Sequence, residues 1–226
     1  MEENKTSLPE NAQRELKPGE KYEPLLSPKK TYPEVTFYSV SVGIVMVIIF
    51  SAAAAYLGLK VGQVFEAAIP IAIIAAGLTG ALGKKGGLGQ NVIIQSIGGS
   101  SGAVVAGAIF TLPAIYILGV EVNFMQMFLS SLLGGVLGIL FLIPFRKYFV
   151  KEMHGKYPFP EATATTQVLV SGEGGGKSAK TLVLSGLVGG LYDFIIATFG
   201  AWGETLTTTV VSVGQTIADK AKLMLK

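Results

Sequence analysis

The chain has 226 residues, of which 50% are hydrophobic and only 15% are charged, with a net charge of +3. A soluble domain carries about 25% charged residues, so the long uncharged runs between a few charged clusters indicate segments that lie in lipid. The absence of cysteine excludes disulfides, thiolate metal ligands and a cysteine nucleophile, and His154 is the only histidine. We therefore expect an integral membrane protein that is not an enzyme and does not bind nucleic acid.

Residues 1–33 are polar and contain five prolines, a composition typical of a disordered tail. The first apolar run starts too late and is too long for a cleavable signal peptide, so we expect a permanent membrane anchor. Residues 34–226 are then a transmembrane helical domain.

Apolar runs predict an all-α bundle of about five to six membrane-spanning helices, since about 20 apolar residues cross a bilayer. The predicted spans lie near residues 37–59, 64–82, 92–118, 122–145 and 182–202, with a cytoplasmic linker at 146–180. Residues 206–218 are either a short sixth span or a helix at the interface. The glycines at 98–102 predict a break or kink in the third span.

The basic residues predict the orientation. If the N-terminal tail is cytoplasmic and all six runs cross, every Lys and Arg except Lys60 falls on the cytoplasmic side, as the positive-inside rule requires.

Amide side chains in the third span are candidates for substrate binding. Gln90, Asn91 and Gln95 fall at membrane depth, and Asn91 and Gln95 share one helix face because they are four residues apart. Neutral donors and acceptors suit a zwitterionic or peptide-like solute. The alternative is interhelical packing, for which Gly, Ser and amide side chains are also typical.

Two carboxylates are candidates for coupling an ion to transport. Asp193 lies within the span at 182–202, and Glu66 lies beside the second span. A charge at the centre of a membrane helix costs at least about 2.5 kcal/mol, so such a residue usually has a function. The alternatives are a structural carboxylate at Asp193 and a side chain facing the outer headgroups at Glu66.

The sequence YPFPEATATTQ at residues 157–167 predicts a rigid turn followed by a short helix, with Glu161 in the first turn where the helix dipole favours a carboxylate. If this helix enters the bundle, Glu161, Thr165 and Gln167 are candidate substrate-binding residues. The alternative is a capped cytoplasmic connector. His154, just before it, is expected to be solvated.

Residues 171–180, SGEGGGKSAK, resemble a phosphate-binding loop, but the first glycine is out of register and no strand precedes it. We interpret this segment as a flexible linker and expect neither a nucleotide nor any other cofactor. Transport would then be driven by an ion gradient.

Four segments resemble the oligopeptide transporter (OPT) family, most closely its bacterial and yellow-stripe-like branch: residues 55–62 with 69–70, 91–114, 134–146 and 154–173. The resemblance implies an all-helical carrier in the cytoplasmic membrane that is driven by protons and transports oligopeptides or metal chelates. Family members are several times longer, so the chain resembles their N-terminal portion. The polar run of residues 165–167 departs from the family pattern and leaves the role of that helix open.

These observations together predict a proton-coupled secondary transporter, or its N-terminal part, for oligopeptides or peptide-like solutes. The expected partners are the lipid bilayer, the solute, a proton, and either the missing C-terminal part or further copies of the chain. The alternatives are a metal-chelate carrier of the same family, a small oligomeric channel or membrane subunit, and a non-functional remnant.

Overall fold

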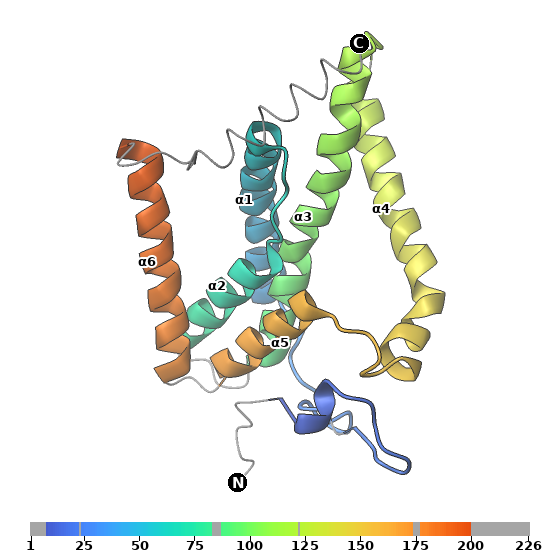
Figure 1. Ribbon diagram of the computed structural model, residues 1–226, viewed down its shortest axis with the longest axis vertical. Helices are drawn as coiled ribbons and strands as arrows, with labels where there is room; N and C mark the ends of the chain where they lie inside the picture. The colour runs from blue at the N-terminus through green and yellow to red at the C-terminus, as the bar shows by residue number, and fades with distance from the viewer. Residues whose placement is uncertain (1–7, 23, 83–86, 122, 174–176, 200–226) are drawn as a thin grey trace, which may run out of the picture. The chain divides into compact units, whose positions relative to one another are not determined.

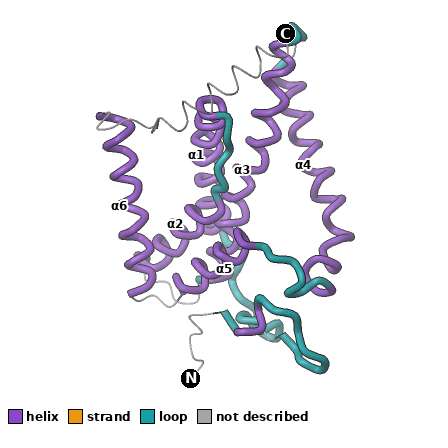
Figure 2. The backbone as a smooth tube through the Cα atoms, in the orientation of Figure 1, coloured by secondary structure: helices purple, strands orange, loops and turns teal. Residues whose placement is uncertain are grey.

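The structure is a computed structural model that describes residues 8–22, 24–82, 87–121, 123–173 and 177–199. These residues form helices and loops with no strand, which confirms the predicted all-α class (Figure 1, Figure 2). The elements in chain order are η1 (Glu10–Ala12), α1 (Phe37–Val61), α2 (Ala68–Ala81), α3 (Leu88–Ile117), α4 (Phe124–Lys147), η2 (Tyr148–Glu152), α5 (Pro160–Glu173) and α6 (Lys177–Phe199).

The chain divides into two compact units, Met1–Leu184 and Ser185–Lys226. Of the second unit, the structure describes only the part of α6 that ends at Phe199. The run at 206–218 lies outside the described residues, so the sixth span stays a prediction.

Three helices are long and apolar enough to cross a membrane. Their spans are Phe37–Lys60, Leu88–Ile117 and Phe124–Glu152. Shorter apolar stretches occur in α2 and in α6, at Ala68–Gly80 and Leu184–Ile196. At 1.5 Å per residue, the 14 residues of α2 extend about 21 Å, which is less than the roughly 30 Å of a bilayer core.

Local signals set both ends of α1. Thr36 caps its start, because the Thr36 Oγ1 accepts a hydrogen bond from the Ser39 N–H at 3.2 Å and the Ser39 Oγ accepts one from the Thr36 N–H at 2.8 Å. This reciprocal pair satisfies two backbone donors that have no partner within the helix. Gly62 ends the helix in the left-handed conformation at φ +76°, which glycine adopts without steric cost.

The bundle core lies where α1 and α2 pack against α3. A buried cluster of Ala67, Ile71, Ala75 and Ile94 joins these helices. Glycines bring the helix axes close together, as is typical of membrane helices. A Cβ built at Gly98 would lie 2.9 Å from the Ile71 Cδ1, which leaves no room for a side chain.

The predicted break in the third span is wrong. α3 continues without interruption through residues 98–102, and none of its glycines has a positive φ. These glycines are used for close helix contacts, a role that does not require the backbone to leave the helical conformation.

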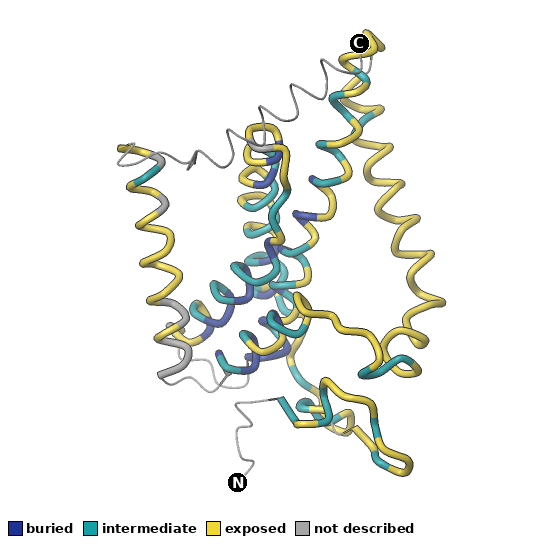
Figure 3. Tube along the Cα trace, viewed as in Figure 1, coloured by how far each residue is buried: buried dark blue, intermediate teal, exposed yellow. Residues whose placement is uncertain are grey.

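The short helix α5 packs against α2 (Figure 1). Leu169 and Val170 of α5 join Ala72 of α2 and Leu88 of α3 in a second buried cluster. Buried residues concentrate in this region, whereas α4 is exposed along its length (Figure 3).

Candidate functional site

The chain between α1 and α2 is not helical, although the sequence predicts a span from residue 64. From the end of α1, residues 62–67 turn back along α1 and α3, and α2 starts beside the middle of α3 (Figure 1). Two contacts fix this path. The Phe65 ring lies 6.2 Å from the Phe50 ring of α1, and the Phe65 carbonyl oxygen would lie 3.3 Å from a Cβ built at Gly102 of α3.

Non-helical backbone next to a helix start leaves peptide groups available for a ligand, because they lack partners within a helix. Gly102 is needed here, since a larger residue would push the Phe65 carbonyl away from α3. We name residues 62–67 the unwound segment. It is the part of the described bundle where backbone polar groups lie against the middle of a long apolar helix.

Glu66 belongs to the unwound segment. Its Oε1 accepts a hydrogen bond from the Ala68 N–H at 3.2 Å, at the positive end of the α2 dipole, and its side chain is otherwise exposed. The carboxylate therefore stabilises the start of α2 while its second oxygen stays accessible.

A buried hydroxyl lies next to the Gly102 contact. Ser101 is fully buried, and its Oγ has no hydrogen-bond partner among the described residues. The neighbouring Ser100 is exposed, and its Oγ donates to the Ile97 carbonyl at 2.7 Å. A buried polar group without a partner costs about 1–3 kcal/mol, so its presence calls for an explanation such as a bound ligand or water.

The predicted amides of α3 have different surroundings. Asn91 is 1% exposed, and its Oδ1 accepts a hydrogen bond from the Thr79 Oγ1 at 2.5 Å, which joins α3 to α2. Gln90 and Gln95 are half-buried. The Gln95 Nε2 lies 3.2 Å from the position of a Cβ at Gly99, on the part of α3 that also contacts Ala68. Asn91 thus takes part in helix packing, and Gln95 lies nearer the unwound segment.

The predicted residues of α5 do not share one environment. Thr165 is buried, and its Oγ1 has no hydrogen-bond partner among the described residues, whereas Glu161 and Gln167 are exposed. Thr166, next to Thr165, is exposed, and its Oγ1 donates to the Ala162 carbonyl at 2.7 Å. Asp193 lies in α6, and its side chain is outside the described part of the structure.

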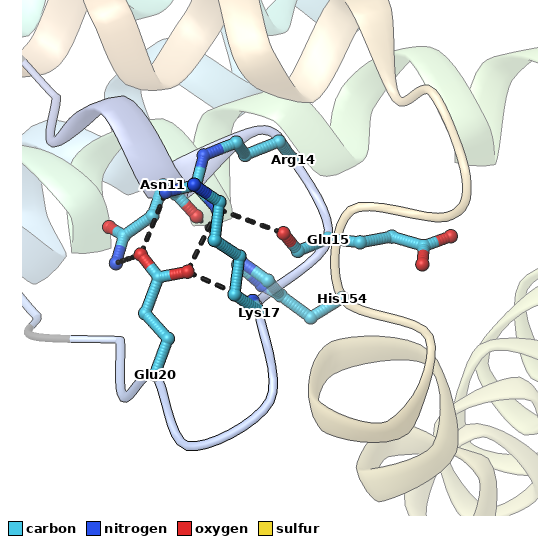
Figure 4. A network of polar contacts seen from close by, with 6 residues as sticks. All are labelled: Asn11, Arg14, Glu15, Lys17, Glu20 and His154. Atoms are coloured by element: carbon cyan, nitrogen blue, oxygen red, sulfur yellow. Dashed lines mark hydrogen bonds and ion pairs between the residues drawn. The ribbon is translucent and has the colours of Figure 1, made fainter.

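A polar network joins the N-terminal tail to the loop before α5, a contact that the sequence analysis missed (Figure 4). The His154 Nε2 lies 2.9 Å from the Asn11 carbonyl oxygen, and Arg14 pairs with Glu20 at 2.8 Å. Hydrogen bonds from the Arg14 side chain and then from the Lys17 N–H lower the pKa of Glu20 to about 2. His154 lies in a turn outside the helices, as expected, but its side chain is half-buried by this contact and not fully solvated.

Gly155 explains how the tail and the loop come so close. Its φ is +73°, and a Cβ at this position would overlap the backbone of Arg14 and Glu15. A cavity of about 650 Å³ opens beside this contact, and its lining includes Tyr22, Tyr157 and Thr166. The first turns of α5 therefore border a hollow whose lining combines aromatic, aliphatic and polar side chains.

Comparison with known proteins agrees with the helical architecture. The family of OPT oligopeptide transporter proteins matches residues 34–225. A protein of Haemophilus influenzae (strain Rd) named "Putative oligopeptide transporter" is 33% identical over 144 residues, which are 62% of this chain and 22% of that protein. The chain thus matches about a fifth of the length of this relative, and no solved structure matches it. Because the family match covers most of the sequence, this membrane protein belongs to the OPT oligopeptide transporter family.

Proposed function

We propose that the chain is part of a secondary active transporter that moves oligopeptides across the cytoplasmic membrane and is driven by protons. Membership of the OPT family supports the transport function, and the relative named as an oligopeptide transporter supports the substrate class. Since the chain matches only about a fifth of that relative, the activity proposed is that of the assembled transporter.

The unwound segment is the observation that carries this proposal. α3 has 30 residues, enough to cross a bilayer, and Gly102 lies at its middle. The contact between Gly102 and the Phe65 carbonyl therefore supports a position near the bilayer midplane for the second half of the unwound segment. Transporters bind substrates and coupling ions at interrupted helices near the midplane, because freed backbone groups and helix ends supply polar partners there.

The contact between the tail and the α4–α5 loop supports four crossings before residue 148. Asn11 and His154 can form their hydrogen bond only if both lie on the same side of the membrane. An odd number of crossings between them would put them on opposite sides of the membrane. Because α1, α3 and α4 make three crossings, a fourth crossing is needed. The unwound segment reaches at most about 20 Å and α2 about 21 Å, which together are enough for that crossing.

The basic residues put this shared side in the cytoplasm, by the positive-inside rule. The tail is rich in Lys and Arg, and the stretch from the last turn of α4 to α5 carries Arg146 and three lysines, whereas Lys60 lies near the opposite end of α1. The N-terminus of the transporter is then cytoplasmic.

Substrate contacts are assigned to the polar residues around the unwound segment and on α5. A peptide offers backbone N–H and C=O groups, which are the partners that the buried hydroxyls of Ser101 and Thr165 lack. The amides of α3, with Gln167 and the carboxylate of α5, are the other substrate-binding candidates. These residues are Gln90, Asn91, Gln95, Glu161 and Gln167. Of these, Asn91 would contact substrate only through its amide N–H groups, since its oxygen bonds Thr79.

Proton coupling is assigned to Glu66, with Asp193 as a second carboxylate. Glu66 lies on the unwound segment with one oxygen free, so a proton can bind there without breaking the fold of α2. The interpretation of Glu66 as a headgroup-facing residue is less favoured, because its neighbour Phe65 contacts the middle of α3.

Substitution of adjacent serines tests the site. Ser101→Ala removes the unpartnered hydroxyl, and Ser100→Ala, one residue away, removes a hydroxyl that bonds its own helix. We expect Ser101→Ala to raise the KM for a labelled tripeptide about tenfold, because one lost hydrogen bond is worth about 1.4 kcal/mol. Uptake is measured in membrane vesicles from cells whose own gene carries the change. An equal KM for the two variants contradicts the assignment of Ser101.

A further inference from the structure

A groove between α3 and α4 has no occupant among the described residues. It has a volume of about 710 Å³ and its lining residues come from the second half of α3 and the first half of α4. The two helices make few contacts with each other, and no residue of α4 is buried (Figure 3). Nothing in the OPT assignment or in the substrate proposal uses this surface.

The groove is lined by small residues in a pattern that fits a helix. A Cβ added at Gly107, Gly134 or Gly135 would meet no atom within 4 Å, in contrast to the glycines that pack α1, α2 and α3 together. Ser131 lies one turn before Gly135 on the same face of α4. Small residues four apart let two membrane helices approach closely, whereas lipid gains little from such a surface.

The chemistry of the lining restricts the occupant. Its residues carry no charge, and the polar groups are hydroxyls and one amide. The Thr111 Oγ1 already donates to the Gly107 carbonyl at 2.6 Å, and the Gln126 Oε1 accepts from the Asn123 N–H at 3.1 Å. An occupant is therefore held mainly by van der Waals contacts along an uncharged face, as a transmembrane helix is.

We infer that this groove seats a transmembrane helix from the portion of the transporter that lies outside these 226 residues. The Haemophilus relative matches the chain over only 22% of its own length, so the remainder of such a protein is long enough to supply further helices. The inference rests on the proposed function as part of a larger transporter. The inference identifies the α3–α4 groove as the surface through which this chain contacts the remaining part of the transporter.

The chain contains no cysteine, which permits a sharp test. Ser131→Cys places a single thiol in the groove, and Val136→Cys places one on the opposite face of α4, 48% exposed. In membranes of the source cells, each variant is labelled with a short thiol-reactive diazirine and irradiated. The adducts are purified through a tag on this chain and identified by mass spectrometry.

We expect Ser131→Cys to form an adduct with an apolar helix of an OPT polypeptide outside residues 1–226, at a yield about tenfold above that of Val136→Cys. Adding Gly134→Leu to the Ser131→Cys chain puts a large side chain in the groove, at a position where a Cβ meets no atom within 4 Å. The yield should then fall about tenfold, equivalent to about 1.4 kcal/mol.

Four results overturn the inference: adducts with lipid alone, with a second copy of this chain, with residues 177–226 of the same chain, or equal yields from the two positions. Peptide uptake is measured in the same vesicles. Uptake that persists while the groove adduct is absent rejects this docking surface and leaves the transport function standing. Loss of uptake in cells without the gene is a separate test of that function.

Discussion

Single polar side chains determine how α2 and α3 pack. Asn91 and Thr79 are both buried, and a hydrogen bond between their side chains joins these two helices. In lipid such a bond contributes about 0.6–1.7 kcal/mol, because the unfolded chain in a membrane also finds partners. The pair thus fixes the register of α2 on α3 more than it stabilises the fold as a whole.

Thr79→Val removes the hydroxyl donor and leaves the buried Asn91 side-chain oxygen without this hydrogen bond. We expect the free energy of unfolding to fall by about 1 kcal/mol. Thr111→Val is the matched control, since the Thr111 hydroxyl is exposed and bonds only its own helix, and its effect should be within about 0.5 kcal/mol. Unfolding in SDS, followed by far-UV circular dichroism, measures both. Equal stability of the two variants would show that the Thr79–Asn91 bond is not made.

Glu20 makes the tail network sensitive to acid. Its folded pKa of about 2 lies below the ordinary 4.5, so the Glu20 contacts stabilise the fold of the tail fully above pH 4.5, and this contribution is lost as the pH falls toward 2. An NMR titration of the Glu20 carboxyl carbon in micelles should give a midpoint near 2. Arg14→Met should raise that midpoint toward 4.5, because it removes the largest cause of the shift. A wild-type midpoint near 4.5 would mean that the Arg14–Glu20 pair does not form within the tail.

At the scale of elements, glycines decide which helices touch. Gly98 of α3 lies against Ile71 of α2 and Met46 of α1, where an added Cβ would come within 2.9 Å and 3.1 Å of their side chains. Gly107 of the same helix has open space around it. The two glycines are alike in sequence, and only their position in the bundle separates them.

Gly98→Ala should therefore destabilise the purified chain by about 1–3 kcal/mol through overpacking. Gly107→Ala should be neutral or stabilise it by up to about 1 kcal/mol, since alanine favours the helix. The same SDS unfolding assay compares the two. A larger loss for Gly107→Ala than for Gly98→Ala is incompatible with the helix contacts described here.

Much of the element pattern was predictable from the sequence, and the exceptions have physical causes. Apolar runs near residues 37–59, 92–118 and 122–145 correspond to α1, α3 and α4, because an uncharged run of this length is stable mainly as a helix in lipid. The unwound segment was missed. Its residues 62–67, GQVFEA, contain no proline, and their path depends on contacts with α3 that composition does not reveal.

The candidate site was predictable only in part. Asn91 and Thr165 were candidates by residue type alone, and their burial emerges only in the structure. Ser101 was not singled out, since a serine among glycines is usual at helix contacts. The tail network joins Asn11 to His154, which are 143 residues apart in the sequence, and no local sequence pattern predicts such a contact. One local feature is consistent with the contact: Gly155, directly after His154, has a positive φ, a conformation that glycine adopts without steric cost.

At the scale of the whole molecule, α2 and the unwound segment before it pack on α1 and α3, and we propose that together they form one membrane crossing. In the proposed transporter, the unwound segment brings Glu66 and free backbone groups to the substrate path. We propose that the buried hydroxyls of α3 and α5 bind the substrate and that the α3–α4 groove contacts the rest of the protein. The groove has a test of its own, whereas the roles proposed for Glu66 and the buried hydroxyls depend on peptide transport by the assembled protein.

The most direct test of the central claim is uptake of a labelled tripeptide by membrane vesicles from source cells with the gene intact, deleted, or carrying Glu66→Gln or Asp193→Asn. With the gene intact, we expect uptake that rises with an inward proton gradient and stops when an ionophore collapses it. Deletion should abolish this uptake. Glu66→Gln should leave uptake that no longer depends on the proton gradient. Asp193→Asn should have the same effect if Asp193 is the second coupling carboxylate. Peptide uptake that is unchanged in the deleted strain would contradict the proposed function.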